Sequence, residues 1–169
     1  NIMKEKVLLI FFLCNVALFV SAQSHMEKGL QSISRSSTEA IINFLAGDEL
    51  QGREAGFHGS RVASEYIVSL LQWMGVSSLA DSYFQPFDAY RKERQKKGRL
   101  EVHPDSVAKL KQEVHQKLSM RNVLAMIPGK NTKEYVIVGA HFDHLGIDPA
   151  LDGDQIYNGA DDNASGVSA

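Results

Sequence analysis

Two short blocks near the end of the 169-residue chain carry side chains that could do chemistry. The first, "YVIVGAHFDHLG" (135–146), is an apolar run that ends on His141 and Asp143. The second, "GADDNASG", holds the adjacent carboxylates Asp161 and Asp162 between glycines, which let the backbone approach a ligand closely. Imidazole and carboxylate donors without sulfur suit zinc or a similar divalent ion in a catalytic rather than a structural site.

The spacing within the blocks indicates how these side chains could cooperate. Ligands gather beyond the carboxyl ends of strands in α/β sheets, which is where His141 would lie. Side chains at i and i+2 of an extended segment face the same way, so Asp143 could accept a hydrogen bond from His141 and fix its tautomer. One aspartate of the pair could bridge two metal ions about 3.5–4 Å apart. On spacing alone, a surface turn at His141 and a helix N-cap at the aspartates stay open as simpler interpretations.

Hydrophobic periodicity predicts the elements that must position these blocks. They are a helix from Ser36 to about Gly47 with a Ser36/Glu39 capping box, a helix from about Ser60 to Met74 that ends at Gly75, a strand in "SYFQPFDAY", a short amphipathic helix marked by Val107, Leu110, Val114 and Leu118, and two strands in "NVLAMI" and "EYVIVGA". Pro86 restricts its strand to an edge or a bulge, because proline cannot donate to a ladder. Helices followed by buried strands and a loop-to-helix return predict an α/β sandwich.

The glycine-rich, charged stretch "DELQGREAGFHGS" between the first two helices predicts a loop. We interpret Asp48, Glu49 and Arg53 within it as structural salt-bridge or capping groups rather than catalytic ones. The basic run "YRKERQKKGRL" lies in a charged, insert-like segment near 89–121, and such a run is typical of a solvated face.

The N-terminal residues 1–22 have the layout of a secretory signal peptide, with two lysines, an apolar run and small residues up to Ala22. The alternative, a membrane anchor, needs about 20 apolar residues, and this run is shorter. We therefore expect no stable membrane anchor after cleavage, and an exported protein that is periplasmic or secreted. The single Cys14 would leave with the signal, which excludes a disulfide and a thiol nucleophile in residues 23–169.

Composition limits the other partners. The chain has 18 Lys and Arg against 20 Asp and Glu, so it lacks the basic excess of a nucleic-acid-binding surface, and we expect no nucleic-acid partner. The sequence stops at Ala169, where a helix is beginning, and we expect it to be the N-terminal part of a longer protein. The oligomeric state is not indicated.

The combination of "VIVGAHFDHLG" and "GADDNASG" closely resembles the first two metal-ligand blocks of the zinc-dependent exopeptidase family. That family includes bacterial leucyl aminopeptidases, glutamate carboxypeptidase II, glutaminyl cyclases and the transferrin receptor. The upstream stretch "FLAGDELQGREAGFHGSRVASEYIVSLLQWMG" is similar to the helical lead-in of its exported bacterial aminopeptidase-like members. The resemblance implies a three-layer α/β sandwich with a mixed, mostly parallel central sheet, and residues 23–169 would be its incomplete N-terminal part.

The resemblance also implies roles for single residues. His141 matches the histidine that binds one zinc, Asp143 matches the catalytic-site aspartate that orients this histidine, and Asp161 matches the carboxylate that bridges both zincs. The peptide bond after the bridging residue is often cis in the family, which implies a cis Asp161–Asp162 bond in a complete site. His144 is not a family ligand, and substrate contact or loop hydrogen bonding are both open for it.

The function implied is that of an aminopeptidase that removes N-terminal residues from peptides with two zinc ions and an activated water. The general base and the remaining ligands would lie beyond Ala169, so we expect this chain alone to be inactive. Two alternatives remain, a glutaminyl-cyclase-like enzyme with a single zinc and a binding relative that has lost catalysis.

Overall fold

The computed structural model describes residues 27–92, 100–131 and 133–169. The predicted signal peptide at 1–22, with Cys14, lies outside the described residues, and so does the part of the basic run at 93–99. The chain divides into two compact units, residues 1–40 and residues 41–169, which are described separately.

The described part of the first unit is helical and includes the start of helix α2 (Arg35–Leu45). The helix begins earlier than predicted, because Ser34 Oγ accepts a hydrogen bond from Ser37 N at 3.1 Å. Ser34 therefore caps the helix, and the predicted capping box at Ser36 and Glu39 is wrong. Glu39 instead pairs with Arg35 one turn earlier, at 2.6 Å.

The helical part of the second unit is formed by the end of α2, the 3₁₀ helix η1 (Asp48–Arg53) and α3 (His58–Trp73). The predicted loop between the first two helices thus contains an ordered turn with Leu50 and Arg53 buried. Its core holds buried Leu45, Leu50 and Ala63, together with Ala164 from the end of the chain. The predicted helix at 60–74 is confirmed, and Gly75 follows it with a φ of 72°.

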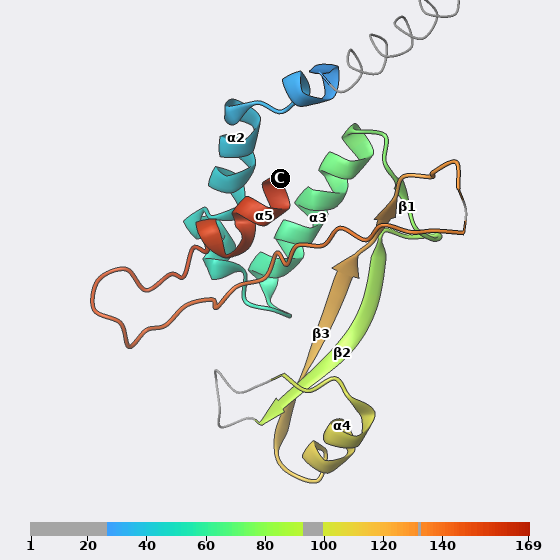
Figure 1. Cartoon of the computed structure of the whole chain (residues 1–169). Coiled ribbons are helices and arrows are strands. Elements are labelled where there is room, and N and C mark those ends of the chain that lie inside the picture. The colour runs from blue at the N-terminus through green and yellow to red at the C-terminus, as the bar shows by residue number, and fades with distance from the viewer. Residues whose placement is uncertain (1–26, 93–99, 132) are drawn as a thin grey trace, which may run out of the picture. The chain divides into compact units, whose positions relative to one another are not determined.

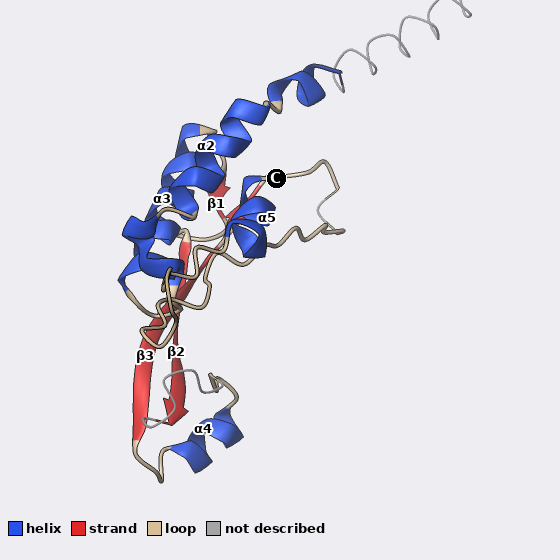
Figure 2. Ribbon diagram, turned by 90° about the vertical axis from the view of Figure 1, so that its left-hand side faces the viewer, coloured by secondary structure: helices blue, strands red, loops and turns tan. Residues whose placement is uncertain are grey.

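Strand β2 (Phe84–Lys92) pairs antiparallel with β3 (His115–Val123), in a register that runs from Phe84 opposite Val123 to Lys92 opposite His115. Figure 1 shows this hairpin extending away from α3, with helix α4 (Pro104–Leu110) at its far end, and Figure 2 shows the same arrangement from the side. The short strands β1 (Ser77–Ser78) and β4 (Ala125–Met126) form a second antiparallel pair.

One residue of the predicted solvated basic run is buried instead. Arg91 is 8% exposed, and its guanidinium bonds Glu54 Oε1 and Gln116 Oε1, each at 2.9 Å. The reason is position, because Arg91 lies on the face of β2 that turns toward the loop between η1 and α3. This ion pair connects the hairpin to that loop.

The predicted amphipathic helix through Leu118 is wrong beyond Leu110, where α4 ends. Leu118 lies in β3 opposite Ala89, and both side chains are buried. The apolar spacing at 107–118 fits a helix period, but cross-strand packing against β2 decides the conformation of its second half.

The apolar run at 134–140 was expected to be a buried strand, and the structure differs. Val136, Ile137 and Val138 are each 93% exposed, and within the described residues no strand pairs with them. A strand covered on both faces needs neighbouring strands to bond its backbone groups and layers to cover it. The described fold is therefore a mixed α/β arrangement with small antiparallel sheets, and a parallel sheet is not part of it.

None of the helices that the structure describes has the length and apolar character required to cross a membrane.

Gly59, in the first turn of α3, makes a close approach to η1 that can be tested. A Cβ built at Gly59 would overlap the carbonyl oxygen of Leu50. We expect Gly59→Ala to lower the free energy of unfolding by more than about 2 kcal/mol, since backbone on both sides would have to move. At Gly129 the nearest atom to a Cβ is Asn131 O at 3.8 Å, so Gly129→Ala is the matched control. Denaturant unfolding followed by circular dichroism measures both, and equal effects would contradict this packing.

Candidate functional site

The two chemistry-bearing blocks meet at the C-terminal end of η1. In the first block, His144 N donates to Arg53 O at 3.0 Å and Gly146 N donates to Gly52 O at 2.9 Å. Tyr157, just before the second block, donates its backbone N–H to Gly146 O at 3.0 Å. Main-chain hydrogen bonds thus bring segments far apart in the sequence into contact.

Gly52 is required at the centre of this contact. Its φ is 66°, and a Cβ there would lie 2.7 Å from Tyr157 O and would overlap Gly146 O. The neighbouring Gln51 and Arg53 also have left-handed backbone, with φ of 51° and 48°. Such conformations cost on the order of 1–3 kcal/mol for a residue with a side chain, and they persist where the surrounding contacts impose them.

Arg53 is fully buried, and its guanidinium donates to main-chain carbonyls of three segments. Nε donates to Phe142 O at 2.7 Å, Nη1 donates to Leu45 O and to Asn158 O, the latter at 2.6 Å, and Nη2 donates to Gly159 O at 2.9 Å. Burial lowers the pKa of Arg53, and the negative charges of Asp143 and Asp162 oppose that shift. The interpretation of Arg53 as a structural rather than catalytic group agrees with these contacts.

Asp48, from the same turn, accepts a hydrogen bond from Asn158 Nδ2 at 2.7 Å, and that amide also donates to Ala46 O at 2.7 Å. This is a structural contact between two side chains, whereas the sequence interpretation of Asp48 named a salt bridge or a helix cap. The proposed structural role of Glu49 stays a prediction.

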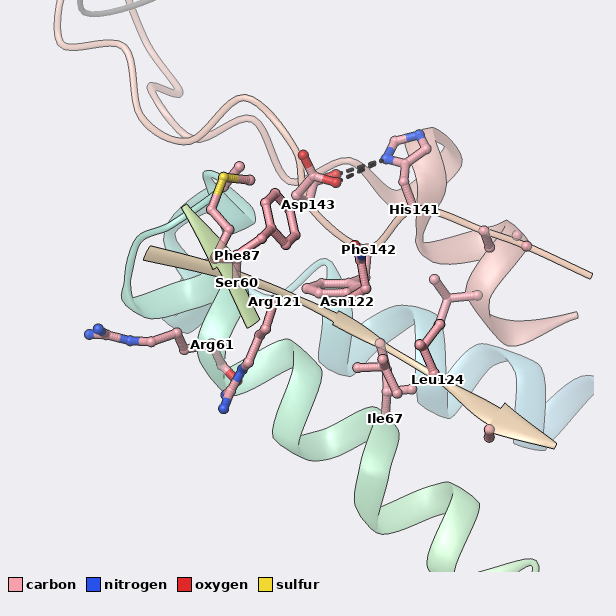
Figure 3. A pocket seen from close by; sticks show the side chains of 18 of the residues that line it. Ser60, Arg61, Ile67, Phe87, Arg121, Asn122, Leu124, His141, Phe142 and Asp143 are labelled. Carbon is pink, nitrogen blue, oxygen red and sulfur yellow. Dashed lines mark hydrogen bonds and ion pairs between the residues drawn. The ribbon is translucent and has the colours of Figure 1, made fainter. Parts of the chain in front are cut away.

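His141 and Asp143 face the same side, as their spacing predicted. His141 Nδ1 lies 3.0 Å from Asp143 O and 3.7 Å from Asp143 Oδ1. Phe142, between them, turns the other way and packs against the buried core, which fixes the direction of its two neighbours. Figure 3 shows both polar side chains beside a cavity of about 880 Å³ that α3, the hairpin and residues 137–143 line.

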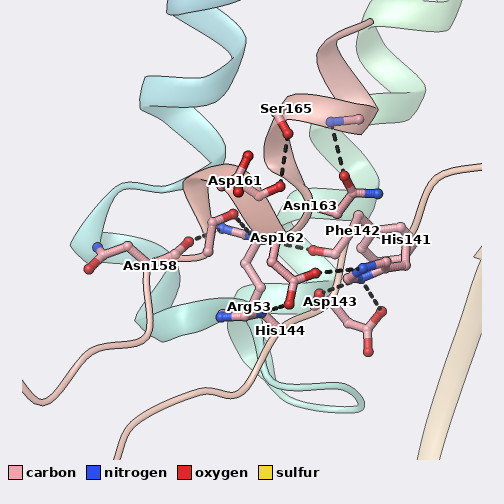
Figure 4. A network of polar contacts seen from close by, with 12 residues as sticks. Arg53, His141, Phe142, Asp143, His144, Asn158, Asp161, Asp162, Asn163 and Ser165 are labelled. Carbon is pink, nitrogen blue, oxygen red and sulfur yellow. Dashed lines mark hydrogen bonds and ion pairs between the residues drawn. The ribbon is translucent and has the colours of Figure 1, made fainter.

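The second block meets the first through Asp162. His141 Nε2 lies 2.9 Å from Asp162 Oδ1, and His144 Nδ1 lies 3.6 Å from Asp162 Oδ2 (Figure 4). The His141 and Asp162 side chains are 51% and 68% exposed, so solutes can reach them. Asp162 is followed by Ala164, which is fully buried and anchors this block in the core.

The two ring nitrogens of His141 do not both have their contacts satisfied by a neutral imidazole. Both ring nitrogens of His141 face acceptors, Asp143 O on one side and Asp162 Oδ1 on the other. A neutral imidazole carries one N–H and can satisfy only one of them. The second contact therefore needs a second proton on the ring or a metal ion between nitrogen and carboxylate. With Nδ1–H donating to the carbonyl, Nε2 is the nitrogen that would bind metal.

The donor types fit zinc, which takes imidazole nitrogen and carboxylate oxygen. The 2.9 Å between His141 Nε2 and Asp162 Oδ1 is somewhat shorter than the roughly 3.4 Å that tetrahedral geometry sets between two zinc ligands, so a small outward rotation would suffice. Among the described residues no group of three or more His, Cys, Asp or Glu side chains is placed to hold a metal ion. The described chain thus supplies part of a donor set.

Asp161, the bridging ligand implied by the resemblance, is placed differently. Its side chain points away from His141 in Figure 4, and its carbonyl oxygen accepts a hydrogen bond from Ser165 Oγ at 2.8 Å. The cis peptide bond is Asp162–Asn163, whereas Asp161–Asp162 was expected. The ligand role of Asp161 stays a prediction, and Asp162 is the carboxylate that the structure brings to His141. The sequence signal for Asp162 was the adjacent pair itself, which could not distinguish its two members.

The simpler interpretation of the pair, a helix N-cap, is not what the structure shows. Asn163 Oδ1, not an aspartate, accepts the hydrogen bond from Gly166 N at 3.1 Å, just before α5 (Ser165–Ser168). His144 is held by its backbone bond to Arg53, and its side chain is only 11% exposed, beside Tyr157. Loop hydrogen bonding is therefore observed for His144, and substrate contact stays a prediction.

Residues 122–169, which contain both blocks, match the family model of peptidase family M28. No curated protein and no solved structure matches the chain. The resemblance to the zinc exopeptidase family is confirmed by this match, and the match supports a metal-dependent peptidase. The family is generally zinc-dependent, in agreement with the donor types of His141 and Asp162.

The choice between the two aspartates is directly testable. We expect Asp162→Asn in the full-length protein to weaken zinc binding by at least about 10- to 100-fold, because the carboxylate that faces His141 Nε2 is lost. Asp161→Asn is the matched neighbouring change, and a smaller effect is expected from it. Chelator competition measures both affinities. A larger loss in the Asp161 variant would restore the assignment made from the resemblance.

Proposed function

We propose that this protein is a metal-dependent exopeptidase, most specifically an aminopeptidase that hydrolyses N-terminal residues from peptides at a site with two zinc ions. The observation that carries the proposal is the 2.9 Å contact between His141 Nε2 and Asp162 Oδ1, inside the segment that matches the peptidase family. An exposed imidazole and an exposed carboxylate within reach of each other are donor types that a hydrolytic metal site uses.

In this proposal His141 donates Nε2 to one metal ion, and Asp143 keeps the ring in the tautomer that leaves Nε2 free. Asp162, or Asp161 as the resemblance implies, would supply the carboxylate ligand of the site. Bound zinc would supply a coordinated water with a pKa near 7 and polarisation of the scissile carbonyl. The proton acceptor for that water is expected from a glutamate outside the printed sequence, as in the family that the sequence resembles.

The finer parts of the proposal rest on the resemblance of the two blocks. Their "HFDHLG" and "DDNASG" forms look most like those of the aminopeptidase branch, so peptides with a free N-terminus are the proposed substrates. A three-layer sandwich with a mostly parallel sheet is proposed for the complete domain, in which the exposed run at 134–140 would be a strand. Export to the periplasm or the exterior of a bacterium is proposed from residues 1–22.

The activity of the full-length protein tests the proposal. We expect a peptide with a free N-terminus to be shortened from that end, whereas its N-acetylated counterpart, which lacks the terminal amine, is left intact. A chelator should abolish turnover and added zinc should restore it, because the nucleophile depends on the metal. Peptide mass spectrometry follows the products, and metal analysis of the active protein should give two zinc ions per chain.

Other outcomes of that experiment separate the alternatives. Ammonia release from an N-terminal glutamine without loss of the residue, with one zinc per chain, would establish a cyclase. Zinc binding without turnover of any peptide would indicate a binding relative. Intact activity in the fully metal-free protein would refute the proposal.

Residues 23–169 by themselves are expected to show no peptidase activity. The described residues bring one histidine and one carboxylate together, and a catalytic zinc site takes three protein ligands and an activating base. Purified 23–169 should release no product above a metal-only control. Zinc-dependent turnover by this piece, abolished in its His141→Ala variant, would show that the described residues suffice.

A further inference from the structure

We propose that Arg53 is a positioning residue that holds the His141 segment and the Asp162 segment at the separation at which both can bind one metal ion. The inference rests on the proposed metal site but not on the identity of the substrate. Arg53 itself contributes no ligand atom. It contacts the backbone of the two segments that carry the proposed ligands, His141 and Asp162.

The contacts of the guanidinium reach both ligand-bearing segments. Nε donates to the carbonyl of Phe142, the residue between His141 and Asp143, at 2.7 Å. Nη2 donates to the carbonyl of Gly159, three residues before Asp162, at 2.9 Å. One rigid planar group therefore spans the two backbones from which the metal-facing side chains project (Figure 4).

The shape of arginine matters for this role. A guanidinium offers five N–H donors in a fixed fork, so that the directions of its hydrogen bonds set the spacing of the acceptors. A lysine ammonium at the same depth is a single point donor, and it cannot bond both carbonyls along the directions seen here. The acceptors of Arg53 named above are all main-chain oxygens, so the spacing that it imposes is a backbone spacing.

The tight packing of Gly159 means that the backbone spacing set by Arg53 affects the distance between Asp162 and His141. Gly159 has a φ of 61°, and a Cβ there would lie 2.7 Å from the His144 ring and close to Asp162 O. Gly159 therefore packs directly against the His144 ring of the first segment, with no side chain of its own in between. A shift of the Gly159 carbonyl on Arg53 would move Asp162 relative to His141 by a comparable distance. The charge of Arg53 also lies in the field of Asp143 and Asp162.

The test compares Arg53→Lys with Arg121→Lys in the full-length protein. Arg121 is a matched arginine whose fork ties β3 to α3, with Nε donating to Ser64 Oγ at 2.8 Å and Nη2 donating to Arg61 O at 2.9 Å. Both changes remove a fork and keep the charge, but only Arg53 contacts the ligand segments. Three quantities are measured: the zinc dissociation constant by chelator competition, the visible absorption spectrum of bound cobalt, and the melting temperature of the metal-free protein.

We expect Arg53→Lys to weaken zinc binding by about 10- to 100-fold, the range seen when a supporting residue of a metal site is lost. Its cobalt spectrum should change, because the angle between the two ligands changes. Arg121→Lys should lower the melting temperature while the zinc affinity and the cobalt spectrum stay those of the wild type. A folded Arg53→Lys protein with wild-type zinc affinity and spectrum would overturn the inference.

A second variant covers the case in which Arg53→Lys does not fold. Asn158→Ala removes the side-chain bonds to Ala46 O and Asp48 Oδ1, which tie the same acidic segment to the same turn, from a residue that is only partly buried. It should weaken zinc binding in the same direction by a smaller factor, and unchanged affinity would overturn the inference. If the wild type binds zinc but cleaves no peptide, the proposed peptidase function fails and the positioning role is still decided by these affinities. If the wild type binds no zinc, both fail.

Discussion

A buried guanidinium joins the parts of this molecule that matter for chemistry. Placing an isolated charge inside a protein costs several kcal/mol, and the cost is offset only when its donors are hydrogen-bonded. Each bond from a charged donor contributes about 1.5–3 kcal/mol, and Arg53 makes four of them to carbonyls of Leu45, Phe142, Asn158 and Gly159. The buried guanidinium of Arg53 is stable only when these carbonyls surround it. The same hydrogen bonds therefore hold the three chain segments together.

The chemistry of the site follows from what this constraint brings together. Phe142 packs into the core, which turns His141 and Asp143 outward, and buried Ala164 holds the second block beside them. His141 then has an acceptor at each ring nitrogen, and one of the two contacts is complete only with a second ring proton or a metal ion. An exposed imidazole and carboxylate over a buried, hydrogen-bonded support are the arrangement that the proposed metal site would need, because outer contacts orient metal ligands.

Elsewhere the described structure shows what a strand requires from its neighbours. Residues 84–92 and 115–123 form a regular ladder because each has a partner, and buried Ala89 lies opposite buried Leu118. Residues 136–138 are more apolar than either strand, yet they remain exposed without a ladder in the described part of the chain. Apolar composition creates the tendency to be buried, but only adjacent strands and layers can satisfy the backbone groups of such a segment.

The sequence by itself determined the identity of the chemical groups and much of the local structure. The helix of residues 58–73 follows from its periodicity, the shared direction of His141 and Asp143 follows from the two-residue repeat of an extended chain, and the family follows from the two blocks. Local spacing could not indicate which of Asp161 and Asp162 faces His141. Both are aspartates, and they differ only in the direction in which the backbone points their side chains. Local spacing likewise could not reveal that Arg53, about 90 residues before His141, supports that histidine's segment. Only the tertiary structure shows which aspartate faces His141 and which carbonyls Arg53 bonds, since each depends on which distant group lies within hydrogen-bond reach.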